Sequence, residues 1–237
     1  MGFGNKIKNA IKRIVKMPKK YIVTIILGVM VIITGAMAIK SGNLRRPLNY
    51  PSSLDVVAIT VGDTEITLRD MAFYVAYEEM EVEKQAVVYD PEDPNKYWNI
   101  HTDGEFVKVA AKNAAIQMAI HDQIFCQMAE ADGVTLETSD YEFIRNSESD
   151  FLSDLEDYEG LEKLGVTEED ICNSIERVAL AQKYQQMYAE MNGENMEAYD
   201  FTGDAYKELV EKNYEYKIKE KIWERIRFGN VILEHLN

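Results

Sequence analysis

The stretch VAITVGDTEITLRDM, residues 57–71, predicts how the folded part of this chain begins. Apolar residues alternate with smaller ones over 57–61, which is the period of a half-buried strand. Gly62, with the aspartate that follows it, suits a two-residue type II′ hairpin turn, which requires glycine in first place. The residues from Thr67 to Asp70 then resemble a capping box at the start of a helix. Because so small a hairpin is only marginally stable alone, we expect another segment to complete it.

The sequence beyond the hairpin predicts a mainly helical domain with a small sheet at its ends. Apolar residues recur at steps of three and four, the spacing of amphipathic helices. The predicted helices cover about residues 68–87 and 105–131, an acidic segment after 138, a segment after Thr167 that ends near 192, and a last one from about 204 to 228. Residues 231–236, VILEHL, are the only other strand-like segment. We therefore expect them to supply the third strand and to join the two ends of the domain.

Charge divides the chain into two parts. Residues 1–50 hold ten of the 26 Lys and Arg and no acid, so the remainder has 16 basic residues against all 41 acidic ones, a net charge of −25. An acidic domain disfavours nucleic acid as a partner, because phosphate binding depends on Lys and Arg.

An uncharged run of 19 residues, 21–39, follows the basic segment 1–20. Its length is close to the roughly 20 residues that cross a bilayer core. Seven basic residues precede the run and three follow it, which by the positive-inside rule places residues 1–20 in the cytoplasm. A cleaved signal peptide is the alternative, since residues 36–38, AMA, fit a cleavage site, but the run is longer than a usual signal-peptide core. We favour an uncleaved, single-pass anchor in a bacterial cell membrane, a linker over 40–54 and an extracytoplasmic domain over 55–237.

Two cysteines, Cys126 and Cys172, would lie in the oxidising compartment outside the membrane, where a disulfide between them is one alternative. Each falls within a helical pattern, where a single cysteine usually behaves as a small buried hydrophobe. We therefore favour buried free thiols.

The sequence offers little for catalysis or metal binding. Of the three histidines, His101, His121 and His235, only His121 has an adjacent acid, and neighbouring residues do not share a helix face. The acidic loop near Asp90 lacks the central glycine and closing Glu of a calcium-binding loop. No serine or cysteine catalytic signature and no phosphate-binding loop is present. We expect a domain that is not an enzyme and that uses no cofactor or metal.

The order of the predicted elements resembles the chaperone module of the SurA- and PrsA-type extracytoplasmic foldases. The hairpin VGDTEIT and first helix come first, followed by the helix that ends DQIFCQMAEADGV at residues 122–134, a T-x-x-D-capped helix and a returning C-terminal helix. Full-length members carry a parvulin-type prolyl isomerase domain before the returning helix. Residues 192–203 leave no room for a domain of about a hundred residues. The resemblance therefore implies a chaperone module without isomerase activity.

Soft apolar residues give the candidate binding site. Flexible methionine side chains suit surfaces that adapt to varied partners. Tyr184, Met187, Tyr188 and Met191 lie together where the apolar stripe of one helix widens, and we predict that they bind peptide, with burial in the core as the alternative. Together with the resemblance, they predict a chaperone-like protein that binds unfolded or nascent exported polypeptides. A non-catalytic docking subunit of a membrane or cell-surface complex is the rival function.

Overall fold

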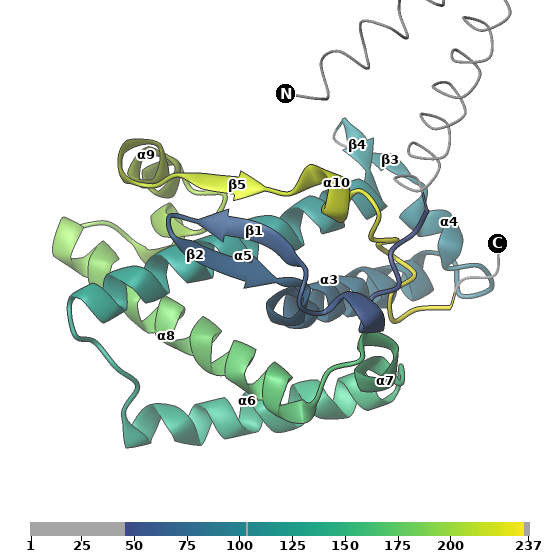
Figure 1. The fold of residues 1–237 in the computed structure, drawn as a ribbon, viewed down its shortest axis with the longest axis horizontal. Helices are drawn as coiled ribbons and strands as arrows, with labels where there is room; N and C mark the ends of the chain where they lie inside the picture. The colour runs from purple at the N-terminus through teal and green to yellow at the C-terminus, as the bar shows by residue number, and fades with distance from the viewer. Residues whose placement is uncertain (1–45, 103, 235–237) are drawn as a thin grey trace, which may run out of the picture. The chain divides into compact units, whose positions relative to one another are not determined.

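The computed structural model of the chain describes residues 46–102 and 104–234, and within them the protein is mainly helical with two small antiparallel sheets, as predicted (Figure 1). Its α-helices are α3 (Leu68–Tyr89), α4 (Asn95–Trp98), α5 (Val107–Ala131), α6 (Thr138–Glu156), α7 (Gly160–Leu164), α8 (Glu168–Asn192), α9 (Asp204–Asn213) and α10 (Glu220–Trp223). The 3₁₀-helices are η1 (Pro51–Ser53) and η2 (Met196–Tyr199).

The predicted anchor over 21–39 lies outside the described residues. Among residues 46–102 and 104–234, no helix is long and apolar enough to cross a membrane.

The hairpin predicted at the start of the domain is present. Strand β1 (Val57–Val61) pairs antiparallel with β2 (Thr64–Thr67) across a two-residue turn. Gly62 takes a φ of 57° in that turn, the left-handed region that glycine enters without steric cost. A separate two-stranded ladder joins β3 (His101–Thr102) to β4 (Glu105–Phe106).

The third strand of the main sheet differs from the prediction. It is β5 (Tyr216–Ile218), which pairs antiparallel with β1 to give the order β2-β1-β5. The last predicted helix is confirmed at its start, near 204, but its continuation to about 228 is wrong, because α9 ends at Asn213 and the chain then enters β5. The predicted strand over 231–236 is also wrong for its described part: residues 231–234 form no strand, and 235–237 lie outside the described residues.

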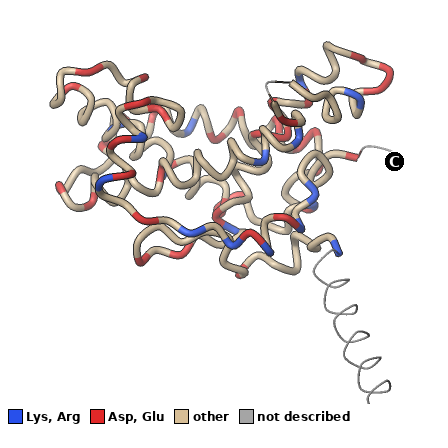
Figure 2. The backbone as a smooth tube through the Cα atoms, turned by 90° about the horizontal axis from the view of Figure 1, so that it is seen from above, with Lys and Arg blue, Asp and Glu red and all other residues tan. Residues whose placement is uncertain are grey.

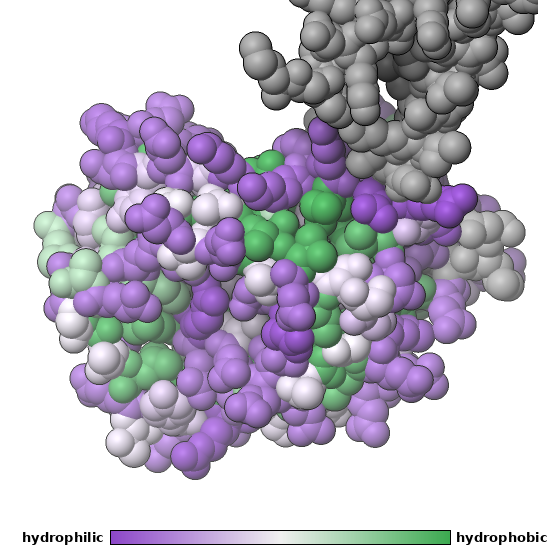
Figure 3. Space-filling view, viewed as in Figure 1, coloured by the Kyte–Doolittle hydropathy of each residue, from purple (hydrophilic) through white to green (hydrophobic). Residues whose placement is uncertain are grey.

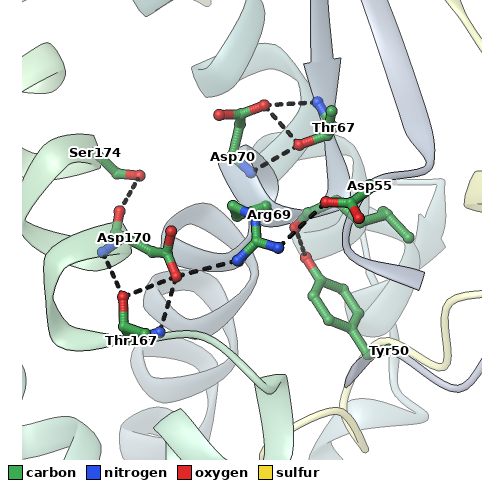
Figure 4. A network of polar contacts seen from close by, with 9 residues as sticks. Tyr50, Asp55, Thr67, Arg69, Asp70, Thr167, Asp170 and Ser174 are labelled. Atoms are coloured by element: carbon green, nitrogen blue, oxygen red, sulfur yellow. Dashed lines mark hydrogen bonds and ion pairs between the residues drawn. The ribbon is translucent and has the colours of Figure 1, made fainter. Parts of the chain in front are cut away.

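Two matching capping boxes start the helices α3 and α8. In each, a threonine side chain accepts from the backbone N–H of an aspartate three residues later, Asp70 in α3 and Asp170 in α8. Figure 4 shows Arg69 between them, with Nη1 3.3 Å from Asp170 Oδ2 and Nη2 3.2 Å from Asp55 Oδ1. Arg69 thus joins the first turn of α3 to the first turn of α8 and to Asp55, which precedes the hairpin.

The core lies between α5, α3 and α8, with the sheet against α5. Gln127 of α5 donates from Nε2 to the carbonyl oxygen of Val61 at 3.2 Å and to Thr64 Oγ1 at 3.0 Å. Ile59 and Val61 point to this side and are fully buried. Helix α5 therefore packs against the sheet and bonds to both strands of the hairpin.

The folded domain begins earlier than the predicted linker allows. Tyr50 is buried, and its hydroxyl donates to the carbonyl oxygen of Leu68 at 2.6 Å. The N–H of Leu48 donates to the carbonyl oxygen of Arg225 at 2.9 Å. Residues 47–54 thus pack onto the domain, because their apolar side chains and backbone donors find partners there.

Candidate functional site

A buried polar network crosses the core around Asp122 of α5. Its carboxylate accepts from the hydroxyl of Tyr74 at 2.9 Å and lies 2.9 Å from Nδ1 of His121. His121 Nε2 lies 3.0 Å from the carbonyl oxygen of Tyr199. The expectation that adjacent residues of one helix do not meet is wrong for His121 and Asp122, because the two side chains bend toward each other inside the core.

This network contains the residue types of an acid–base catalytic site, but its side chains are buried and a substrate could not reach them. His121 and Asp122 are each 6% exposed, and Tyr74 is 4% exposed. Burial is the largest cause that raises the pKa of the Tyr74 hydroxyl, and the Asp122 carboxylate adds to it. Each polar atom has an internal partner, so the network joins α3, α5 and η2 and specifies their packing.

A second buried carboxylate holds the end of the described chain. Glu79 of α3 is fully buried and accepts from the backbone N–H groups of Gly229 at 2.6 Å, Val231 at 3.1 Å and Ile232 at 2.8 Å. Burial raises the pKa of Glu79 to about 7, and the backbone donors oppose that rise. We call residues 229–232 the captured segment, since a side chain satisfies its backbone donors in place of a sheet.

Neighbouring residues close over this carboxylate. Trp98 of α4 is 2% exposed and donates from Nε1 to Glu83 Oε2 at 2.9 Å. A Cβ atom placed on Gly229 would lie 2.8 Å from Cε3 of Trp98, so only glycine fits against the indole. Every donor here is used within the fold, so the captured segment has a structural role.

An open cleft of about 490 Å³ lies between α5, α9 and β5, and we call it the β5 cleft. Its apolar lining comes from two alanines of α5 and from Phe201, Val210 and Tyr216, and its polar lining includes Asn113, Gln117, Lys207 and Glu211. The α5 residues Ala110 and Ala114 are small, so they do not fill the space between α9 and β5. The cleft therefore has the mixture of an apolar floor and a few polar groups that is typical of binding sites.

Tyr206 of α9 gives the β5 cleft a buried polar group without a partner. Its ring lies 4.9 Å from that of His121 and 6.2 Å from that of Phe125, measured between centroids. The side chain lines the cleft at 3% exposure, and its hydroxyl has no hydrogen-bond partner among the described residues. Burial raises the pKa of this hydroxyl, followed by the charge of Asp122. An unsatisfied buried hydroxyl is costly, and because this oxygen is closed off from solvent, the ring of Tyr206 and not its hydroxyl faces the cleft.

A second open cleft, of about 610 Å³, lies between the C-terminal end of α5, α8 and α6. Val134, Leu136 and Leu180 supply apolar lining, and Glu130, Glu176 and Arg177 supply charge. We call it the α6 cleft. No strand lines it.

Apolar surface also gathers beside β5. Figure 3 shows a hydrophobic area over the region where Figure 1 places α10 and the adjoining ends of β1 and β5. Ile218 of β5 and Ile222 of α10 are half-buried apolar residues in these elements. An edge strand with apolar neighbours is a surface that another chain can extend.

The four residues predicted to bind peptide are placed differently from one another. Tyr184 is 3% exposed and its hydroxyl donates to Asp132, so it belongs to the core. Tyr188 is half-buried, with its ring centroid 5.1 Å from that of Tyr199. Met187 and Met191 are 37% and 64% exposed on the outer side of α8. The two methionines thus present an apolar surface, whereas the two tyrosines support the fold.

The cysteines are both free. Cys126 is buried and donates from Sγ to the carbonyl oxygen of Arg177 at 3.2 Å, and burial raises the pKa of this thiol to about 11. Cys172 is half-buried. Among residues 46–102 and 104–234, no group of three or more His, Cys, Asp and Glu side chains is arranged to hold a metal ion.

Sequence reasoning missed the β5 cleft because its parts come from three separate elements. One local signal was present: Tyr214, Tyr216 and Ile218 alternate with charged residues, which is the period of a strand. Tyr214 and Ile218 also fit a helical spacing of four and Tyr216 one of seven, and the strand and helix patterns cannot be separated over so few positions.

No protein-family model, no curated protein and no solved structure matches this chain. The resemblance to the SurA and PrsA type of module therefore stays a prediction from the sequence.

Proposed function

We propose that this chain is a membrane-anchored, extracytoplasmic chaperone-like protein that holds unfolded or nascent exported polypeptides without isomerising them. The single observation that carries the proposal is the β5 cleft, an open apolar groove beside a strand at the edge of a sheet. Unfolded chains expose both apolar side chains and unpaired backbone groups, and this groove offers a partner for each.

The charge of the domain supports the same function. Figure 2 shows Asp and Glu spread widely along the described chain, with Lys and Arg between them. An excess of negative charge keeps complexes with unfolded clients soluble and favours basic clients through long-range attraction. The order of hairpin, α3, α5 and α8 supports a module of the SurA and PrsA type.

The experiment that tests the proposal is suppression of aggregation. The full chain, kept in a neutral detergent, is added to a chemically denatured client protein, and light scattering is followed as the client is diluted into buffer with the same detergent. We expect near-stoichiometric amounts of the chain to lower scattering for several unrelated clients. Detergent alone, and an equal amount of an unrelated acidic protein, are the controls.

A dedicated docking subunit would behave differently in that experiment. No effect on any client, combined with recovery of one stoichiometric partner from membranes, would replace the chaperone proposal with the docking function. Prolyl isomerase activity in the purified chain would contradict the absence of catalysis.

A further inference from the structure

The outer edge of β5 carries backbone groups that the sheet does not use. The N–H of Gly62 donates to the carbonyl oxygen of Glu215 at 2.8 Å, and the N–H of Lys219 donates to that of Ala58 at 2.8 Å. Because the pairing of an antiparallel ladder alternates, Lys217 faces β1 with both of its backbone groups. The N–H and C=O groups of Tyr216 and Ile218 therefore point away from β1.

No described segment covers that edge. Strand β5 is the last strand in the order β2-β1-β5, and the backbone groups of Tyr216 and Ile218 have no hydrogen-bond partner among residues 46–102 and 104–234. Edge strands in proteins are often blunted by proline, a bulge, a covering element, a short length or a lysine, and β5 has only the last two, with three residues and Lys217 in the middle. Here two pairs of backbone groups remain available for a fourth strand.

The β5 cleft lies against this same strand. The side chain of Tyr216 lines the cleft, so a strand added beside β5 would place every second side chain over the cleft. The apolar floor, with Val210 on its α9 side, suits apolar side chains at those positions.

The charges beside the cleft do not select a charged ligand. Lys207 and Glu211 both line the cleft, and Lys207 is paired with Asp204, with Nζ 3.1 Å from Oδ1. Lys217, the middle residue of β5, carries its side chain on the face opposite that of Tyr216. Apolar contact and backbone pairing are therefore the interactions that this site offers.

We infer that an extended polypeptide segment with alternating apolar side chains adds to β5 as a fourth strand, with its apolar side chains in the β5 cleft. This inference rests on the proposed function and names its site and its mode of binding. It gives sequence tolerance, because the bonds to Tyr216 and Ile218 use backbone groups that all residues except proline share.

The decisive experiment uses N-methylated peptides. The probe is a fluorescein-labelled nine-residue peptide that alternates valine with the uncharged residue glutamine, and its binding to the full chain is measured by fluorescence anisotropy. Two further peptides carry N-methyl groups on the central valines or on the central glutamines. The N–H groups of one set face β5, while those of the other face solvent.

We expect methylation of one set to weaken binding about tenfold or more, since two hydrogen bonds are lost, and methylation of the other set to change it little. Loss confined to the valine set indicates an antiparallel added strand, and loss confined to the glutamine set a parallel one. Equal losses, or no loss in either set, would overturn strand addition while leaving polypeptide binding intact. No binding by the unmodified peptide, together with no suppression of client aggregation, would contradict the proposed function itself.

A pair of protein variants tests the same edge. Ile218→Pro removes an N–H that points away from β1 and so leaves the β1 ladder bonds in place, whereas Ile218→Val keeps that N–H. We expect several-fold weaker peptide binding for the first and wild-type binding for the second. Unchanged binding by a folded Ile218→Pro variant would contradict the inference. If that variant fails to fold, the methylated peptides decide.

A variant in the α6 cleft is the matched control. Leu136→Lys changes an apolar lining residue far along the chain from β5, and we expect it to leave peptide affinity unchanged. A larger loss for Leu136→Lys than for Ile218→Pro would move the site to the α6 cleft. A dimer that Ile218→Pro abolishes, without peptide binding by the wild type, would show that β5 pairs with a second copy and would overturn the inference.

Discussion

The captured segment and the β5 edge lie close together in the sequence and treat their backbone donors in opposite ways. In the captured segment, residues 229–232, three N–H groups donate to the single buried carboxylate of Glu79. In β5, the outward N–H groups of Tyr216 and Ile218 have no partner among the described residues. The comparison teaches that a strand-like sequence does not decide which segment joins a sheet. The captured segment has a strand-like sequence, but its N–H groups donate to Glu79 and need no neighbouring strand.

The largest expected effect comes from removing the carboxylate. Glu79→Ala leaves three buried N–H groups without an acceptor, and we expect a loss of about 3 kcal/mol in the free energy of unfolding at pH 6. Both tryptophans of the chain, Trp98 and Trp223, lie in this domain, so urea unfolding of the full chain can be followed by their fluorescence. Glu78→Gln is the neighbouring control, which should cost little. A Glu79→Ala variant as stable as wild type would mean that the captured segment needs no acceptor.

The pH dependence of stability sharpens the same contrast. The pKa of Glu79 is raised to about 7, above its ordinary value of 4.5, so the folded state binds more protons than the unfolded state between these values. Stability from this group is therefore full below about pH 4.5 and falls as pH rises toward 7, by about 3 kcal/mol in total. The pKa of Glu78, raised to about 7 by burial and then by Glu81, adds a slope of the same sign.

The measurement is the urea midpoint between pH 5 and 7.5 for the wild type and for Glu79→Gln. We expect the midpoint of the wild type to fall more steeply with pH, since the amide does not titrate. Parallel curves would show that Glu79 keeps its charge throughout this range.

A smaller effect is expected at the glycine of the captured segment. Gly229 has a φ of 85°, and a side chain there would meet the ring of Trp98. We expect Gly229→Ala to cost about 2 kcal/mol in the free energy of unfolding, measured by the same fluorescence assay. Gly193→Ala is the matched control, because Gly193 has a φ of 70° but open space around its Cβ position, so only the backbone cost of about 1 kcal/mol applies. Equal losses in the two variants would remove the indole contact from the explanation.

The smallest expected effect concerns the β5 cleft, and it is a gain in stability where the other variants lose stability. Tyr206→Phe removes a buried hydroxyl without a partner, so we expect a gain of about 1 kcal/mol in stability, measured by the same fluorescence assay. Tyr74→Phe is the contrasting variant, since its hydroxyl donates to Asp122 and its loss should be destabilising. Loss of stability in Tyr206→Phe would indicate that the hydroxyl is already satisfied.

Much of the fold follows from local sequence rules. The hairpin turn at Gly62, the two threonine caps and the long helices each depend on residues within a few positions of one another, and all of these are present. The order of strands in the sheet was not predictable in this way. Residues 231–234 have strand propensity, but Glu79, about 150 positions earlier, captures their N–H groups.

The β5 cleft was not among the sites predicted from the sequence. None of the four residues predicted to bind peptide lines it. Met187 and Met191 are exposed on α8, and Tyr184 is buried with its hydroxyl on Asp132. The β5 cleft arises from the distance between α5 and α9, which no residue pattern along one element encodes.

The early anchoring of the chain has a mechanical consequence. Leu48 bonds to the carbonyl oxygen of Arg225, and Tyr50 is buried with its hydroxyl on Leu68. Tension applied to the chain before residue 46 would thus reach the domain at residues 48–50 and be shared with segments near both ends of the folded unit. The hairpin would then not be the first element to detach, so β1 would keep its register with β5 under such tension.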